Sequence, residues 1–426
     1  MKKSNEYAAL IIGAGPAGSA TAAILAEYGH RVLVIEREKF PRYHIGESLL
    51  PFTYHPLKRL GLLEKMRRSC FVKKYSVQFV SPSGRASQPF YFSTRYEDKV
   101  AQTWQVLRSE FDQMLMDNAR EKGAEILEET TVKEFLREGS RVVGVRVAAK
   151  DGTLTEFRAP ITVDCSGKES FSASRNSWRV KDPYLNKVAV WTYFKGAKRD
   201  EGIDAGATTV AYVPDKGWFW YIPQHNDMIS VGVVAEGKYL TRGGVKDLES
   251  IFKREVEQNA WIKSHVAVGQ QTGAYFILNE FSWHSRHCAS EGLVLAGDAF
   301  AFLDPVFSSG VMLALKSGVM VADYVHKAIQ SGNYSPAIFE EYGKFMREGI
   351  ENMRRLIYAF YDPKFSFRVL TNKHPEAAGW VTDCLSGDVN KDFSELYRQV
   401  AELCELPEVL PYGKPLMPQE EAAMVK

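Results

Sequence analysis

A glycine-rich turn near the N-terminus has the spacing of a phosphate-binding loop. Gly13, Gly15 and Gly18 stand in the order GxGxxG, between an apolar run and a run of small residues. In a strand–turn–helix unit the first glycine permits the turn, the second admits a pyrophosphate, and the third lets helix and strand pack closely. Glu36 ends the next β-branched segment, where a carboxylate accepts hydrogen bonds from ribose hydroxyls. We therefore predict a dinucleotide site rather than a plain glycine-rich turn.

Two tryptophans alternate in the run WFWYIP at 218–223. Tryptophan is large and has few rotamers, so Trp218 and Trp220 beside a cofactor would form a wall that bars a substrate from it. Packing inside an ordinary buried strand is the other interpretation. A second run, FLDPVFSSG at 302–310, leads into a predicted helix over 311–329. Its backbone N–H groups suit an anion, although Ser308 or Ser309 acting as a helix cap also explains it.

Two adjacent lysines, Lys73 and Lys74, lie in the segment 72–80, which is predicted to be a strand. Neighbouring residues of a strand point to opposite sides, so only one of the two faces inward. An inward lysine among apolar neighbours is costly without a task, and desolvation lowers its pKa. Two surface charges are the alternative.

The composition limits the class of protein. The chain has 426 residues, 45% hydrophobic and 25% charged, with a net charge of +2, which excludes disorder and a coiled coil. Scattered charges argue against nucleic acid, and five cysteines without a CxxC predict no disulfide framework, no zinc site and a reducing compartment. The glycines at 13–18 argue against a signal peptide, and no later stretch suits a membrane span. We expect a cytoplasmic protein with no stable membrane insertion.

The motifs together resemble the FAD-dependent monooxygenase superfamily. A GxGxxG turn near the N-terminus and a late apolar strand ending in Gly-Asp, here GLVLAGD at 292–298, are typical of it. The resemblance implies that Asp298 contacts the ribityl–pyrophosphate part of FAD and that Arg108 helps to hold it, although a helix cap also explains an aspartate there. It further implies cofactor contacts from Ala17, Arg37, Ser48, Pro305 and Gly310.

Within that superfamily the chain is similar to flavin-dependent halogenases. WFWYIP matches their WxWxIP signature, FLDPVFSSG matches FxxPxxSxG, and YHIGESLLP at 43–51 is similar to a third segment. The resemblance is greatest to the branch that acts on phenolic, pyrrolic or carrier-bound substrates. It implies that FADH2 and O2 give a flavin C4a-hydroperoxide, which oxidises chloride or bromide to hypohalous acid. It places halide at the Ser309 and Gly310 amides and gives Lys74 the task of guiding the halogen.

One position departs from the family pattern. Tryptophan-modifying halogenases carry a glutamate just before the serine of FxxPxxSxG, whereas this chain has Phe307. An electron-rich ring needs less help from a carboxylate, so Phe307 argues against free tryptophan as substrate. We expect a small aromatic or carrier-protein-bound substrate. Because no second GxGxxG is evident for NADPH, we also expect a separate NAD(P)H-dependent flavin reductase.

The elements predict an α/β fold with an FAD-binding Rossmann-like domain interleaved with an antiparallel-sheet substrate domain, plus a helical C-terminal region. The expected FAD-binding domain comprises 1–80, 100–180 and 285–333, the substrate domain 81–99 and 181–284, and the helical region 334–426. Within the substrate domain, 188–234 is rich in Val, Trp, Tyr and Phe, as expected of antiparallel strands. A flavin-dependent monooxygenase, a geranylgeranyl-reductase-type enzyme and a non-enzymatic flavin-binding scaffold remain alternatives.

Overall fold

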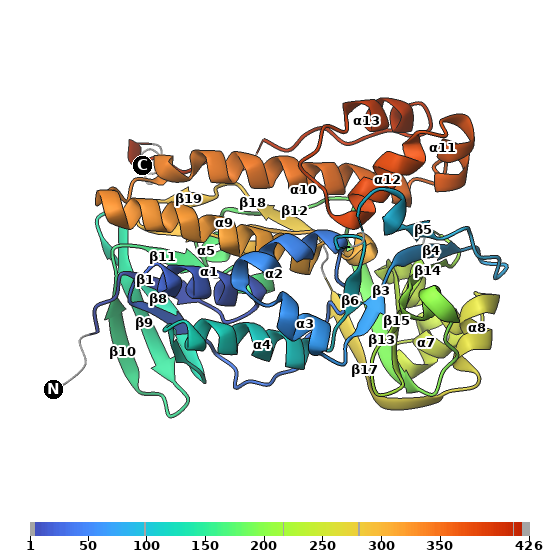
Figure 1. Ribbon diagram of the computed structural model, residues 1–426, viewed down its shortest axis with the longest axis horizontal. Coiled ribbons are helices and arrows are strands. Elements are labelled where there is room, and N and C mark those ends of the chain that lie inside the picture. The colour runs from blue at the N-terminus through green and yellow to red at the C-terminus, as the bar shows by residue number, and fades with distance from the viewer. Residues whose placement is uncertain (1–4, 98, 216, 280–281, 412, 420–426) are drawn as a thin grey trace.

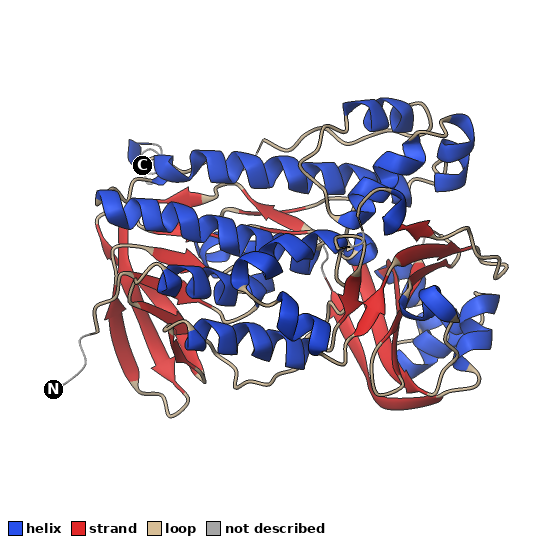
Figure 2. Cartoon of the chain, in the orientation of Figure 1, coloured by secondary structure: helices blue, strands red, loops and turns tan. Residues whose placement is uncertain are grey.

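The computed structural model describes residues 5–419 apart from 98, 216, 280–281 and 412. A parallel sheet with its helices occupies one end of the molecule, and a larger antiparallel sheet occupies the other (Figures 1 and 2). Two long helices, α9 (Gly310–Ser331) and α10 (Glu340–Tyr361), run along one side of the molecule. This is the predicted α/β architecture, with Rossmann-like and antiparallel parts and a helical C-terminal region.

The Rossmann-like part is a six-stranded sheet whose central strand leads into the glycine turn. β1 (Ala9–Ile12) pairs in parallel with β2 (Val32–Ile35) and β11 (Thr162–Asp164). All residues of these three strands are buried, because helices pack on one face of the sheet and a three-stranded sheet packs on the other. The outer strands are β7 (Glu125–Leu127), β20 (Leu293–Leu295) and β19 (Ala289–Ser290). A three-stranded sheet flanks them, formed by β8 (Thr130–Glu138), β9 (Arg141–Ala149) and β10 (Leu154–Arg158).

The second part is a seven-stranded sheet that carries the tryptophan motif on its middle strand. Its order is β17 (Gln270–Asn279), β13 (Lys187–Lys195), β16 (Met228–Glu236), β15 (Trp218–Pro223), β14 (Thr208–Tyr212), β4 (Ser76–Val80) and β5 (Phe90–Tyr91). The antiparallel sheet predicted for 188–234 is confirmed, and β14 adds a parallel pairing with β4. Phe219 and Tyr221 belong to the core under α7 (Leu248–Val256) and α8 (Ala260–Val266), whereas Trp218 and Trp220 face the main core.

The strand predicted over 72–80 is wrong in one respect. The chain forms two strands there, because β3 (Val72–Lys74) pairs with β6 (Thr103–Gln105) and β4 joins the seven-stranded sheet. The pairing partner changes at Tyr75, from antiparallel β6 to parallel β14, so the strand is interrupted there. β4 thus enters the seven-stranded sheet at Ser76, a few residues before the predicted domain boundary at residue 80. The predicted domain boundaries stay predictions.

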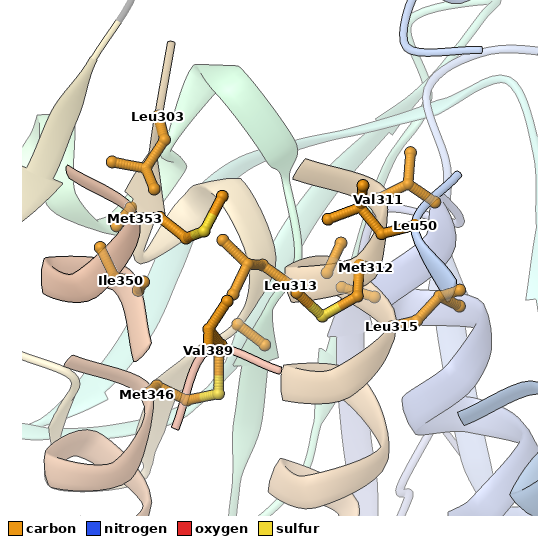
Figure 3. Close-up of a cluster of buried hydrophobic side chains, with 14 of the residues drawn as sticks. Leu50, Leu303, Val311, Met312, Leu313, Leu315, Met346, Ile350, Met353 and Val389 are labelled. Carbon is orange, nitrogen blue, oxygen red and sulfur yellow. The ribbon is translucent and has the colours of Figure 1, made fainter. Parts of the chain in front are cut away.

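The C-terminal helices pack on the nucleotide-binding part. Figure 3 shows Met312 and Leu313 of α9 meeting Met346, Ile350 and Met353 of α10 in one apolar cluster. α11 (Phe367–Lys373), α12 (Ala377–Ser386) and α13 (Ser394–Ala401) follow at the end near the seven-stranded sheet (Figure 1). Among the described residues of 334–419, helices dominate up to Ala401, as predicted, and they contribute to the main core.

The remaining elements connect these layers. They are α1 (Pro16–Glu27), α2 (Tyr54–Leu60), α3 (Leu63–Arg68), α4 (Arg108–Glu121), α5 (Phe171–Arg175), α6 (Gly237–Leu240), β12 (Arg179–Lys181), β18 (Trp283–Ser285) and β21 (Ala301–Phe302). Within the part of the chain that the structure describes, we find no helix with the length and apolar character that crossing a membrane requires.

Candidate active site

A cavity of about 940 Å³ runs from the glycine turn to the tryptophan strand. Its wall includes Gly13 and Glu36 from the nucleotide-binding part, Trp218 and Trp220 from the seven-stranded sheet, and Gly310 from the start of α9. The chain thus brings together, around one space, residues that lie up to about 300 positions apart. A cavity of this size and apolar character is typical of a cofactor or small-molecule site.

Two positions of the turn at 13–18, Gly13 and Gly18, have room for glycine only. Gly13 has a φ of +95°, and a Cβ there would lie 2.6 Å from the Cys165 carbonyl oxygen. A Cβ on Gly18 would lie 1.9 Å from the Gly13 oxygen. α1 begins at Pro16, and the N–H groups of its first turn, which includes Ala17, have no intrahelical acceptor. This geometry is suited to an anionic group at the helix start.

Glu36 is held in place beside the turn. Its Oε2 accepts a hydrogen bond from the Ala14 N–H at 2.8 Å, and its Oε1 accepts one from the Glu38 N–H at 2.8 Å. Each carboxylate oxygen keeps a further lone pair for a ribose hydroxyl. Arg37 lines the rim of the cavity and forms an ion pair with Glu169.

Arg108 is buried and contacts the cavity with only part of its guanidinium. Nε and Nη2 donate to the two Asp112 oxygens at 2.8 and 2.9 Å, and Nη1 donates to the Ile45 carbonyl at 2.7 Å. Arg108 therefore fixes the backbone before Ser48 as well as lining the cavity. Asp298 lines the same region, where burial raises its pKa to about 6 although the Arg108 charge opposes this.

Arg42 is a residue that the motif reasoning did not assign. It lines the cavity, and one of its terminal nitrogens would be 3.7 Å from a Cβ on Gly15. Its Nη1 is buried without a hydrogen bond of good geometry and lies 3.1 Å from Asp112. A cation this close to the glycine turn suits a pyrophosphate, and its only signal in the sequence was its place in the segment ahead of YHIGESLLP.

The tryptophan wall is fixed by hydrogen bonds at each indole. Trp218 Nε1 donates to the Tyr361 hydroxyl at 2.8 Å, and Trp220 Nε1 donates to Ser230 Oγ at 3.0 Å. The two ring centroids are 6.2 Å apart, and Trp191 stands 6.0 Å beyond Trp220. All three line the cavity, so the indoles form a continuous face.

The 302–310 loop meets the cavity at the start of α9. Pro305, Ser308 and Gly310 line it, whereas Ser309 is 1% exposed. A Cβ on Gly310 would meet nothing within 4 Å, so the cavity reaches this backbone directly. The Ser309 side chain does not cap the helix, and the first-turn amides remain available to an anion.

Lys74 is buried and Lys73 is exposed, so one of the two lysines faces inward, as strand alternation predicted, and it is the one that the family resemblance indicated. Lys74 Nζ donates to Ser48 Oγ at 2.9 Å and to the Leu49 carbonyl at 3.0 Å. Ser48 lines the cavity, so the amine lies one hydroxyl away from it. Burial lowers the pKa of Lys74 to about 7.

These residues fit FAD. Glycine contacts and a bare helix start suit the pyrophosphate, Arg42 adds a cation, and Glu36 suits a ribose. Residues 6–348 match the family model described as FAD binding domain. A 1H-pyrrole-2-carbonyl-[peptidyl-carrier protein] brominase of Pseudoalteromonas luteoviolacea is 32% identical, with 80% of this chain and 82% of that protein covered. The chain belongs to the flavin-dependent halogenases.

Two further comparisons agree with this family. A 1H-pyrrole-2-carbonyl-[peptidyl-carrier protein] chlorinase of Pseudomonas fluorescens is 28% identical, with 90% of both chains covered. The solved structure of the flavin-dependent brominase Bmp2 has a TM-score of 0.84 at 29% identity and covers 93% of this chain and 98% of its own. This flavin-dependent halogenase therefore binds FAD, and the residues around the glycine turn are those positioned to hold it.

The site of this halogenase also holds a buried acid that the motif reasoning missed. Glu47 is 1% exposed, lines the cavity, and accepts a hydrogen bond from the Tyr193 hydroxyl at 2.8 Å. Burial raises its pKa. It precedes Ser48 in the third family segment, but nothing in the sequence indicated that its side chain is buried.

Proposed function

We propose that this halogenase uses FADH2 and O2 to oxidise chloride or bromide to hypohalous acid, and that Lys74 directs the halogen onto an electron-rich ring. When bound, the reduced flavin supplies the two electrons that activate O2. The overall reaction consumes the ring C–H, a halide ion, FADH2, O2 and one proton. It yields the C–halogen bond, FAD and two water molecules, so atoms, electrons and charge balance.

The position of Lys74 is the observation that carries the proposal. A fully buried amine bonded to the hydroxyl of a cavity-lining serine is costly to keep unless it has a task. With a pKa of about 7, a large fraction of this amine is neutral in mildly alkaline solution. A neutral amine is nucleophilic towards the halogen of hypohalous acid, which supports the haloamine route over a purely hydrogen-bonding role.

The chain's other groups have supporting tasks. Trp218 and Trp220 are rigidly bonded and exclude a ring from the flavin, so direct hydroxylation is prevented. The amides of Ser309 and Gly310 at the start of α9 bind the halide. The same walls exclude water, and this prevents side reactions of the oxidant.

We further propose that the substrate is a pyrrole-2-carbonyl group on a carrier protein. Two similar proteins are named for that substrate. Phe307 stands where tryptophan-modifying relatives have a glutamate. The centroid of its ring lies 5.7 Å from that of Phe360 and 6.1 Å from that of Phe367. These aromatic side chains around position 307 supply no base. Their apolar character suits a substrate ring whose own substituent stabilises the cationic intermediate.

A separate flavin reductase supplying FADH2 is part of the proposal, because the sequence has one GxGxxG and no evident motif for NADPH. The test combines the protein with FAD, an NADH-dependent flavin reductase, bromide or chloride, and a pyrrole-2-carbonyl-loaded carrier protein. Mass spectrometry should show the halogen isotope pattern on the loaded carrier. Hydroxylated or reduced product would instead support the monooxygenase or the geranylgeranyl-reductase alternative, and turnover without the reductase would contradict its role.

A further inference from the structure

Tyr361 is the last residue of α10, and its hydroxyl forms hydrogen bonds both to the tryptophan wall and to the loop before α9. Its hydroxyl accepts the Trp218 indole N–H at 2.8 Å and donates to Asp304 Oδ2 at 2.9 Å. The three residues come from the seven-stranded sheet, the C-terminal helices and the 302–310 loop. The C-terminal region thus touches both motifs that define the halogenase site.

Asp304 links this bridge to the backbone of the loop. It is 0% exposed, and its other oxygen, Oδ1, accepts the Val306 N–H at 3.1 Å. Its own N–H donates to Ser282 Oγ at 2.8 Å. One carboxylate therefore fixes the single helical turn over Pro305–Phe307 that precedes Ser309 and Gly310.

The direction of each hydrogen bond in the bridge is determined by the groups themselves. An indole N–H only donates and an ionised carboxylate only accepts, so the Tyr361 hydroxyl must accept from Trp218 and donate to Asp304. Burial raises the pKa of Asp304 to about 6, against the hydrogen bonds from Tyr361 and Val306 and the Lys187 charge, so the carboxylate is ionised at neutral pH. The Lys187 ammonium lies 4.4 Å from the centre of the Tyr361 ring. No other arrangement of these three groups satisfies both ends.

The apolar packing of α10 keeps Tyr361 in position. Met346, Ile350 and Met353 of this helix pack against α9, which begins directly after the loop (Figure 3). A rigid helix can therefore hold the wall and the loop at a fixed separation.

We propose that Tyr361 is a positioning residue that fixes Trp218 relative to the halide loop through Asp304, so that the C-terminal helix completes the active site. The inference rests on the proposed function of the wall and of the loop. Without the hydroxyl, the indole N–H and Asp304 Oδ2 each lose a partner and the loop is no longer tied to the wall. Oxidised halide then escapes before it reaches Lys74.

The test compares Tyr361→Phe with Tyr358→Phe. Tyr358 lies one turn earlier on the same helix, and its hydroxyl donates to Asp182 Oδ1 at 2.6 Å, so this control loses one hydrogen bond where Tyr361→Phe loses two. We expect similar FAD binding in the two and a somewhat lower thermal midpoint in Tyr361→Phe. Only Tyr361→Phe should lower halogenated product per flavin oxidised, roughly ten-fold, with a several-fold higher KM for halide.

A second measurement does not depend on turnover. Hydrogen exchange of the backbone amides at 306–310 in the FAD-free protein should be roughly ten-fold faster in Tyr361→Phe than in Tyr358→Phe, because the loop is no longer bonded to Tyr361. Asp304→Asn, which removes the accepting charge at the other end, should give the same two changes. Variants equal to Tyr358→Phe in both measurements would overturn the inference, whereas a wild-type protein that forms no halogenated product would refute the proposed function instead.

Discussion

Replacing Lys74 by methionine should abolish halogenation and make the stability of the variant relative to wild type depend on pH. Methionine keeps most of the volume of the lysine stem and removes the ionisable group. Burial lowers the pKa of Lys74 from 10.5 to about 7, so between these values the unfolded chain binds a proton that the folded chain does not. The free energy of unfolding of the wild type therefore falls as the pH is lowered through this window, and below about pH 7 this group adds no further change.

The size of the effect follows from the two pKa values. Each pKa unit corresponds to about 1.4 kcal/mol, so the buried amine costs the folded state about 4 kcal/mol at pH 7 and about 1 kcal/mol at pH 10. Methionine also leaves Ser48 Oγ and the Leu49 carbonyl without the amine donor, at about 1–3 kcal/mol each. That loss does not depend on pH. The stability of the variant relative to wild type should therefore be greater at pH 7 than at pH 10 by about 3–4 kcal/mol.

Equilibrium unfolding in urea at several pH values between 7 and 10 measures this difference directly. Lys73→Met is the matched control, because Lys73 is exposed and its replacement should change stability equally at all pH values. If the difference in the free energy of unfolding between Lys74→Met and wild type is the same at pH 7 and pH 10, the Lys74 amine keeps its usual pKa and is charged in the folded protein. The reasoning from burial to a neutral nucleophile would then be refuted.

Three more outcomes follow from the site. Halogenation should rise between pH 6 and pH 8, as the neutral fraction of Lys74 grows from about one tenth to about nine tenths, and a falling profile would indicate a hydrogen-bond donor instead. Lys74→Ala should consume O2 and release peroxide or free hypohalite without halogenated product, while Lys73→Ala stays active; two active variants would contradict the assignment of Lys74. Ser309→Pro should bind FAD but lose halogenation, because the backbone at Ser309, with a φ of −78°, accepts proline while the amide donor disappears. Wild-type chlorination by Ser309→Pro would refute the halide site.

The sequence predicted the parts of the site that depend on local structure. Gly13 and Gly18 indicate the turn in the sequence, because a Cβ at either position would lie less than 3 Å from neighbouring backbone atoms. Alternation along a strand predicted that one of Lys73 and Lys74 faces inward, and the family resemblance indicated Lys74; the opposite orientation of the two holds although the strand ends at Lys74. The break itself depends on which strands lie nearby, β6 on one side and β14 on the other, and no residue in 72–80 signals it.

The parts that the sequence did not predict depend on contacts between distant segments. Tyr361 lies in a charged helical stretch and is 143 residues from Trp218, so nothing in its own neighbourhood indicates a bond to the wall. Asp304 occupies a variable position of the FxxPxxSxG pattern, so the pattern did not indicate a role for it. Glu47 is 1% exposed, and its place beside Ser48 in the sequence does not indicate this burial.

These missed residues share a physical feature that distinguishes them from the motif residues. Gly13, Gly310 and Trp218 act through shape or backbone, and shape restricts the residue type enough to leave a motif. Tyr361 and Asp304 act through single hydrogen bonds between elements, where the partner's position and not the local sequence decides the task. In the proposed arrangement the C-terminal helix belongs to the active site through Tyr361, even though its sequence carries no motif.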